Sequence, residues 1–174
     1  MKVAQIWRYP VKSMAGERLN RARIGSLGIE GDRVVHVEDV RGRVITARTH
    51  SRLLGYRAAL NASGEPVVGG LLWTDPEVRE DMVNIVGPGA RLVRDDTGDR
   101  FDVLPLLVAT DGAIAAFGHD GRRLRPNLVI SSVEGLAERL WPGQCLRIGA
   151  VIIGVQDLRG RCIMTTFDPD TLKQ

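Results

Sequence analysis

The sequence has few cysteine, lysine and aromatic residues and lacks any long apolar run. Its 174 residues include two cysteines and three histidines, and aromatic side chains make up 5% of the chain. No apolar run approaches the length of a membrane-spanning helix, and the first residues enter a strand-like pattern without the apolar region of a signal peptide. We therefore expect a cytoplasmic protein with no membrane partner.

The scarcity of cysteine also bears on how the chain is stabilised. One disulfide could join Cys145 to Cys162 on numbers alone. A chain of this length can bury a core large enough to need neither a disulfide nor a structural metal. Inside a cell, reduced thiols are the expected state, so both cysteines should be free.

Several motifs for common chemistries are absent. The three histidines are scattered along the chain and no Cys-x-x-Cys pair exists, which argues against a zinc site. There is no phosphate-binding Gly-x-x-x-x-Gly-Lys loop and no Gly-x-Gly-x-x-Gly turn, so nucleotide hydrolysis and dinucleotide redox chemistry are disfavoured. No local signature of a Cys-His protease surrounds Cys162.

Most of the basic residues are arginines. The net charge is +3, but only three of the 24 basic residues are lysines. A guanidinium group can donate two parallel hydrogen bonds to a phosphate or a carboxylate. The excess of arginine therefore indicates either an anionic ligand or a compositional bias of the genome. The low aromatic content and the absence of a long basic helix predict no nucleic-acid partner.

Short runs of alternating apolar residues, separated by glycine and proline, predict a mainly β fold of the α+β type with a few short helices. Residues 1–100 should form an antiparallel barrel or strongly curled sheet, and residues 101–174 should share a core with it in one compact unit. The expected strands cover residues 3–9, 19–24, 34–40, 43–47, 53–61, 67–73, 83–86, 91–94, 128–130, 146–148 and 151–155. The expected helices cover residues 113–117, after a Thr110-Asp111 cap, and 134–140.

One stretch near the C-terminus, residues 160–171, concentrates reactive groups. Cys162 follows Arg161 and precedes Thr165 and Thr166. A cation and hydroxyl donors would favour the thiolate, which is the nucleophilic and metal-binding form of cysteine. The alternative is that Cys162 is a small buried apolar residue at the end of a strand.

A second candidate lies in the loop between Pro10 and Gly16. Lys12 and Ser13 stand side by side at its centre. The ammonium and the hydroxyl could bind an anion together. On local sequence alone, a solvated turn explains the same residues.

Four separated stretches resemble the MOSC family (molybdenum cofactor sulfurase C-terminal domain), in the branch that includes the mitochondrial amidoxime-reducing component and its bacterial relatives. The order of the four stretches is the family's order, and the cysteine stretch is the most specific of them. They are Tyr9-Pro10-Val11-Lys12-Ser13 with Gly16; Gly31-Asp32-Arg33 followed by Val44-Ile45-Thr46-Ala47-Arg48; Arg125-Pro126-Asn127-Leu128-Val129-Ile130; and residues 161–171.

The resemblance implies a MOSC-like antiparallel β-barrel fold that holds a molybdenum-pterin cofactor. By position, it makes Cys162 the thiolate ligand of the metal and the catalytic cysteine. It also implies that eight positions form the site, with Asp168 either contacting the cofactor or shaping the turn before Pro169. The cofactor contacts implied by position are Lys12, Ser13, Arg33, Arg48, Arg125 and Asn127.

The resemblance also implies a function and partners. The expected activity is a two-electron reduction of N-hydroxylated or similar small molecules, with electrons from a separate electron-transfer partner because no flavin, haem or iron–sulfur motif is present. The alternatives are a sulfur carrier with a Cys162 persulfide and a cofactor-storage protein. Longer family members continue past the cysteine stretch, so the barrel is expected to be shortened at its C-terminus, with a homodimer or another partner at that edge.

Overall fold

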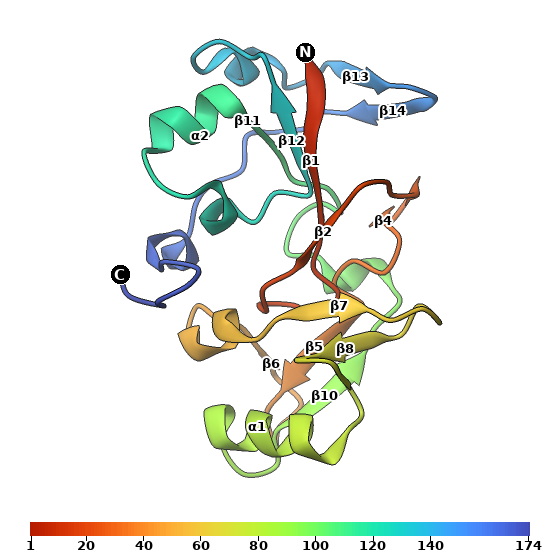
Figure 1. The fold of residues 1–174 in the computed structure, drawn as a ribbon, viewed down its shortest axis with the longest axis vertical. Coiled ribbons are helices and arrows are strands. Elements are labelled where there is room, and N and C mark those ends of the chain that lie inside the picture. Colours follow the sequence, from red (N-terminus) through yellow and green to blue (C-terminus); the bar gives the residue numbers. More distant parts are fainter.

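The computed structural model describes all residues, 1–174, and its central element is a four-stranded sheet (Figure 1). The strands β1 (Lys2–Arg8), β2 (Glu17–Leu19), β11 (Val108–Thr110) and β12 (Leu128–Ser131) lie in the order β11-β12-β1-β2. Only the β11–β12 pair is parallel. Ile6 lies opposite both Leu128 and Leu19, so the sheet joins the first and the second half of the sequence.

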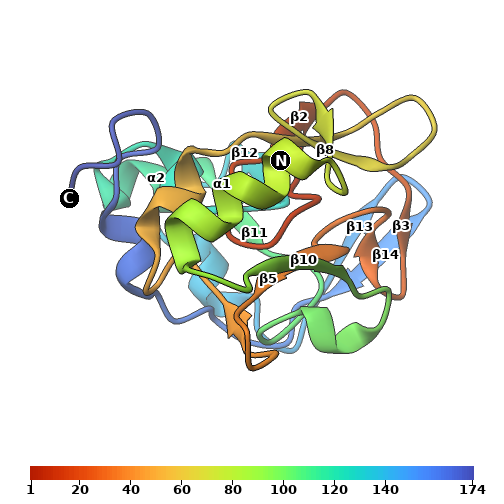
Figure 2. The same ribbon diagram turned by 90° about the horizontal axis from the view of Figure 1, so that it is seen from below.

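A second group of strands forms the lower half in Figure 1. One sheet has the order β10-β5-β6 and another the order β7-β8-β9. The helix α1 (Pro76–Val86) packs on β10, across the lower end of the molecule (Figure 2). The strands are β5 (Val35–Glu38), β6 (Val44–Ile45), β7 (Ala58–Leu60), β8 (Pro66–Val68), β9 (Leu71–Leu72) and β10 (Arg91–Arg94).

Short elements complete the chain. The helix α2 (Asp111–Phe117) follows β11 directly and packs on β11 and β12. None of the helices is long and apolar enough to cross a membrane. The remaining elements are the hairpins β3–β4 (Ile24–Gly25, Gly28–Ile29) and β13–β14 (Cys145–Ile148, Val151–Gly154), and the 3-10 turns η1 (Ser51–Gly55), η2 (Gly98–Arg100), η3 (Gly121–Leu124), η4 (Ala137–Leu140) and η5 (Ile163–Thr166).

The main apolar core lies in the lower half and is covered by the end of the chain. Its 13 buried residues all lie between Val11 and Ala90, and Val11, Met14 and Leu53 are fully buried. Met164, Phe167 and Leu172, from the C-terminal segment, pack against this core. The C-terminal segment is therefore fixed to the first half of the chain by apolar contacts.

The predicted fold class is confirmed, since the structure is mostly strands with two α-helices. The two predicted hairpins, β5–β6 and β7–β8, are present and antiparallel. The helix predicted after Thr110 is α2, and the Thr110 hydroxyl accepts a hydrogen bond from the amide of Ala113 at 2.9 Å.

Several secondary-structure predictions are wrong. Residues 20–23, inside the strand expected over 19–24, are not in a strand, and the strand expected over 53–61 begins within the 3-10 turn η1. Residues 83–86, expected as a strand, form the last turn of α1, because Asp75 caps the helix and Pro76 occupies its first turn. The capping carboxylate accepts a hydrogen bond from the amide of Glu77 at 3.0 Å. Residues 134–140, expected as a helix, contain only the 3-10 turn η4.

Candidate functional site

The predicted site residues converge on one cleft of about 880 Å³ between the upper and lower halves. Its walls come from both halves of the sequence, and the apolar part is formed by residues 101–108, α2 and β14. Seven of the eight predicted residues line it, and Asp168 does not. The seven are Lys12, Ser13, Arg33, Arg48, Arg125, Asn127 and Cys162.

Three of these residues have an unusual backbone conformation. Five non-glycine residues have positive φ, and they include Ser13 (69°), Arg33 (56°) and Arg125 (53°). The left-handed region is sparsely populated by residues with a Cβ, and such residues cluster at functional sites. The strain is held by hydrogen bonds, such as that from the Arg33 amide to the Tyr9 carbonyl at 2.7 Å.

The thiol of Cys162 lies at the start of η5 and is half-buried. The Arg48 guanidinium lies close to this side chain, and that proximity, with the nearby charge of Asp102, raises the pKa of Arg48 against the opposing effect of burial. The two threonines expected as donors to the thiol make other contacts. Thr165 donates through its hydroxyl to the Cys162 carbonyl at 3.0 Å, and Thr166 to the Ile163 carbonyl at 2.7 Å.

The loop that carries Lys12 and Ser13 is packed into the fold, so the solvated-turn alternative does not hold. Ser13 is buried, and its hydroxyl accepts a hydrogen bond from the Ala47 amide at 3.0 Å. The Lys12 ammonium donates to the Arg100 carbonyl at 3.0 Å and pairs with Asp102 at 2.8 Å. Lys12 thus presents its charge to the cleft, whereas Ser13 holds the loop in place.

Arg125 is a cation without an anionic partner. Its guanidinium stacks on the ring of Tyr9 and takes part in no ion pair or side-chain hydrogen bond, and its buried Nη2 has no partner. Burial lowers the pKa of Arg125 to about 10. An unpaired buried charge is costly, so an anion bound beside Arg125 would be favoured.

Asn127 connects three elements with its amide. It is fully buried, and its Oδ1 accepts from the Leu107 amide at 3.1 Å and from Arg33 at 3.4 Å. Its Nδ2 donates to the Trp7 carbonyl at 3.3 Å. Arg33 also pairs with the buried Asp32. Because these polar groups are used within the protein, Asn127 positions Arg33 rather than presenting a free donor to the cleft.

Comparison with known proteins matches both parts of the chain. Residues 1–99 match the MOSC N-terminal beta barrel domain, and residues 113–174 match the MOSC domain. The first match alone covers more than half of the 174 residues. The chain belongs to the MOSC family.

Two human proteins are among the relatives of this MOSC chain. It is 24% identical to mitochondrial amidoxime-reducing component 1 over 233 aligned residues, covering 97% of this chain and 67% of the relative. It is 25% identical to mitochondrial amidoxime reducing component 2 over 227 residues, with the same coverage of each chain. Both alignments are longer than the 174 residues of the MOSC chain, so each relative carries internal segments that this chain lacks.

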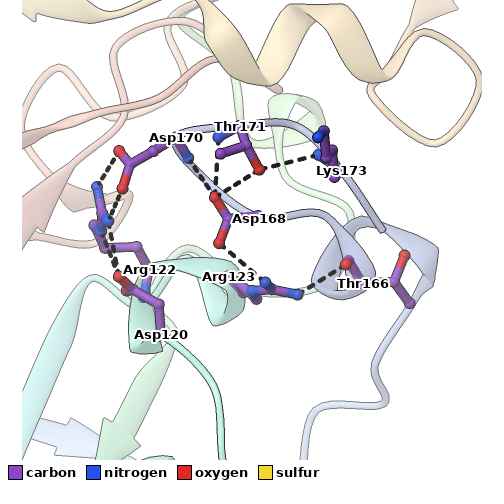
Figure 3. Close-up of polar contacts among 8 residues, drawn as sticks. All are labelled: Asp120, Arg122, Arg123, Thr166, Asp168, Asp170, Thr171 and Lys173. Carbon is purple, nitrogen blue, oxygen red and sulfur yellow. Dashed lines mark hydrogen bonds and ion pairs between the residues drawn. The ribbon is translucent and has the colours of Figure 1, made fainter.

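Asp168 of the MOSC chain shapes a turn outside the cleft (Figure 3). Its Oδ1 accepts from the amides of Asp170 at 3.1 Å and Thr171 at 2.9 Å, and its Oδ2 accepts from Arg123 at 3.1 Å. These hydrogen bonds, chiefly those from the backbone amides, lower the pKa of Asp168 to about 2. Of the two alternatives left by the sequence, the turn-shaping one describes its contacts.

Arg122 and Arg123 bind the C-terminal segment through three acceptors, and we call these contacts the C-terminal clamp (Figure 3). Arg122 pairs with Asp170 at 2.6 Å, and Arg123 pairs with Asp168 and donates to the Thr166 carbonyl at 2.8 Å. Both arginines lie on η3, and Arg123 is two residues before Arg125. The clamp therefore fixes the segment after Cys162 relative to Arg125.

Sequence reasoning missed Asp102, which lies among the cations of the cleft. It pairs with Lys12 and Arg48, and Arg159 is 3.8 Å away. Burial opposes its ionisation, but the contacts with Lys12 and Arg48 outweigh this and lower the pKa of the Asp102 carboxyl. Nothing in its sequence context sets it apart from other acidic residues, because its partners are distant in the chain.

Proposed function

We propose that this MOSC protein binds a molybdenum-pterin cofactor in the cleft, with Cys162 as a ligand of the metal, and that it reduces N-hydroxylated small molecules. The observation that carries the proposal is the position of the Cys162 thiol in a cleft that also holds the Arg48 guanidinium and the unpaired Arg125. A thiolate, a soft ligand, and a set of cations match a metal bound to an anionic organic group.

The donors present fit the anionic part of such a cofactor. Arg125 has a buried nitrogen without a partner, which a phosphate or a polar pterin edge would satisfy. Lys12 and Arg48 would bind the same group by exchanging their contacts with Asp102. Ser13 and Asn127 would contribute by holding these cations in position.

The ligands available for the metal also fit. No group of three or more His, Cys, Asp or Glu side chains that could hold a metal ion is present. Cys162 would thus be the only residue of the chain to bind the metal, and the cofactor itself would supply the remaining ligands. Arg48 would remain beside the ligated sulfur and offset its negative charge.

The bound cofactor would supply two-electron redox chemistry. The reaction breaks the N–O bond of the substrate, takes up two electrons and two protons, and releases water. The chain's own contribution is binding and orientation: residues 101–108 and β14 offer an apolar wall for the organic part of the substrate. The electrons would come from a separate electron-transfer partner. The names of the two human relatives, both amidoxime-reducing components, support this reaction class.

The test is to express the wild type, Cys162→Ala and Cys145→Ala in a host that makes molybdenum cofactor. Cys145 is the matched control, because it is a free, exposed cysteine outside the cleft. Molybdenum, pterin and sulfane sulfur are measured per chain, together with reduction of benzamidoxime by a reduced viologen dye. We expect bound molybdenum and benzamidoxime reduction in the wild type and Cys145→Ala, and neither in Cys162→Ala.

The same measurements separate the alternative of a sulfur carrier. The half-buried, partly accessible Cys162 beside Arg48 is compatible with a persulfide as well as with a metal. If the wild type holds sulfane sulfur but no molybdenum, and Cys162→Ala lacks that sulfur, the protein is a sulfur carrier and not the proposed enzyme. Molybdenum and pterin without benzamidoxime reduction would leave cofactor storage, and a wild type with none of the three would end both proposals.

A further inference from the structure

We propose that a second, smaller cavity is a binding site for a small oxyanion, such as sulfate, phosphate or the head of a carboxylate. This cavity is separate from the cleft and measures about 110 Å³. It lies between the first half of the chain and the C-terminal segment. Its walls are Trp7, Tyr9, Ala15, Gly16, Leu54, Gly55 and Arg57 from the first half, and Arg122, Arg123, Arg125, Met164, Phe167 and Pro169 from the second.

All the charged side chains that line this cavity are positive. Four of its wall residues are arginines, and none is acidic. Arg122 and Arg123 are paired through the C-terminal clamp, with Asp170 and Asp168 (Figure 3). The other two, Arg57 and Arg125, form no ion pair, so the cavity carries uncompensated positive charge that an anion would neutralise.

Two unsatisfied donors belong to arginines that line both the small cavity and the cleft, and Arg123 Nε is not among the groups assigned to the cofactor. Only two buried side-chain nitrogen or oxygen atoms in the chain lack a hydrogen-bond partner, Arg123 Nε and Arg125 Nη2. Both arginines line the small cavity. Buried polar groups are nearly always paired, and exceptions mark sites of a bound water or ion. An oxyanion brings several acceptors at once and would satisfy guanidinium donors better than water.

The cavity is small. Its volume of about 110 Å³ is enough for several waters or for one small oxyanion. The aromatic side chains of Trp7, Tyr9 and Phe167 form the apolar part of the wall and reduce the access of water to the charges.

The site has a structural consequence for the cleft. Arg123 and Arg125 line both the small cavity and the cleft, so they form a shared wall. An anion in the small cavity would hold these guanidiniums in position and would stabilise the folded chain through binding linkage. This inference needs no bound cofactor, so it stands or falls independently of the proposed redox activity.

The three tryptophans provide a test with separate reporters. Trp7 lines the small cavity, Trp141 lines the cleft, and Trp73 lines neither. The cofactor-free full chain is labelled with ¹⁵N and titrated with inorganic sulfate at constant ionic strength, using chloride as the balancing anion. We expect the indole signal of Trp7 to shift and saturate, with Trp73 unmoved.

Two variants assign the shift to its site. Arg57 is exposed, lines only the small cavity and makes no side-chain hydrogen bond, so Arg57→Gln should fold normally. It should weaken sulfate binding at Trp7 by about tenfold, because one charge-assisted contact is lost. Arg57→Lys keeps the positive charge and should therefore retain most of the wild-type affinity for sulfate. Lys12→Ala should reduce only the response at Trp141.

The proposal is overturned if the Trp7 signal shifts linearly without saturation, or if wild type and Arg57→Gln give the same curve, since either result would mean an adventitious ion only. A saturating shift at Trp141 alone would assign sulfate to the cleft and would also overturn it. Repeating the titration with acetate distinguishes a tetrahedral anion from a carboxylate as the preferred ligand.

Discussion

The guanidinium of Arg125 stacks on the ring of Tyr9, with its Cζ 4.3 Å from the ring centroid. Arg33 approaches the same ring at 5.3 Å. Tyr9 is therefore a buried platform for two cations that line the cleft. The Tyr9 hydroxyl donates to the Pro126 carbonyl at 3.2 Å, which fixes the ring.

The platform predicts a specific alkaline sensitivity. Burial raises the pKa of Tyr9 to about 12, above its ordinary value of 10.0. The folded state then holds the phenol proton more tightly than the unfolded state, so this contribution to stability is complete below pH 10.0 and is lost as the pH rises through about 12.

Tyr9→Phe tests this sensitivity. Near neutral pH the variant should lose about 1 kcal/mol with the hydroxyl hydrogen bond. Between pH 9 and 11, urea unfolding should show the free energy of unfolding of the wild type falling relative to that of Tyr9→Phe. A difference that is constant with pH would contradict the assignment.

The C-terminal clamp should position Cys162. Asp168→Asn keeps the turn-forming oxygen but removes the charge paired with Arg123, so the segment after Cys162 should loosen. In a Cys145→Ala background, the single thiol should react faster with iodoacetamide. Asp170→Asn is the matched control and should change the rate less, because Arg122 keeps Asp120 as a partner. If the Cys145→Ala protein and its Asp168→Asn and Asp170→Asn variants react with iodoacetamide at equal rates, the C-terminal clamp does not position Cys162.

The clamp also predicts behaviour in acid. The pKa of Asp168 is lowered to about 2, so its ionised form stabilises the fold above the ordinary value of 3.8 and this contribution is lost as the pH falls toward 2. The urea midpoint of the wild type should drop more between pH 5 and pH 3 than that of Asp168→Asn. Parallel curves would count against the prediction.

Asp102 acts as an internal anion for the cations of the cleft. Asp102→Asn should strengthen the binding of inorganic phosphate in the cleft by about tenfold, because Lys12 and Arg48 lose a competing partner. The indole signal of Trp141 reports binding. Asp157→Asn is the control, since Asp157 lines the same cleft without an ion pair. Unchanged or weaker phosphate binding in Asp102→Asn would contradict this competition.

The sequence-based prediction of a homodimer or partner at the C-terminal edge stays a prediction. The last strands, β13 and β14, form a separate two-stranded sheet, and Ile152 on β14 is 58% exposed. Light scattering should give a dimer mass. A clean monomer at all concentrations would exclude the homodimer.

Much of the site could be predicted from the sequence because its residues occur in short ordered motifs. Lys12 and Cys162 stand out in their local sequence, the resemblance to the MOSC family implies Arg33 and Arg125, and the structure brings all four to one cleft. The motifs could not reveal what each side chain does there. Ser13 and Asn127 are engaged with the backbone of distant segments, which no local pattern encodes.

The failures have physical causes. The β-branched residues at the end of α1, Val83, Ile85 and Val86, favour a strand locally, but the Asp75-Pro76 start and packing on the core favour a helix. Asp102 acquires its role only when residues far apart in sequence meet around it. Sequence reasoning also could not detect the small cavity, since Arg57 joins Arg122, Arg123 and Arg125 only in the fold.

The hydrogen bond from Asn127 to the Trp7 carbonyl spans 120 residues of sequence. During synthesis, β1 leaves the ribosome long before its partner β12, and its unpaired edge must wait for the second half of the chain. The cleft is therefore completed only after residues 161–165, the last of its lining, have been made. Any anion or cofactor that binds there must enter after that segment has folded against the first half of the chain.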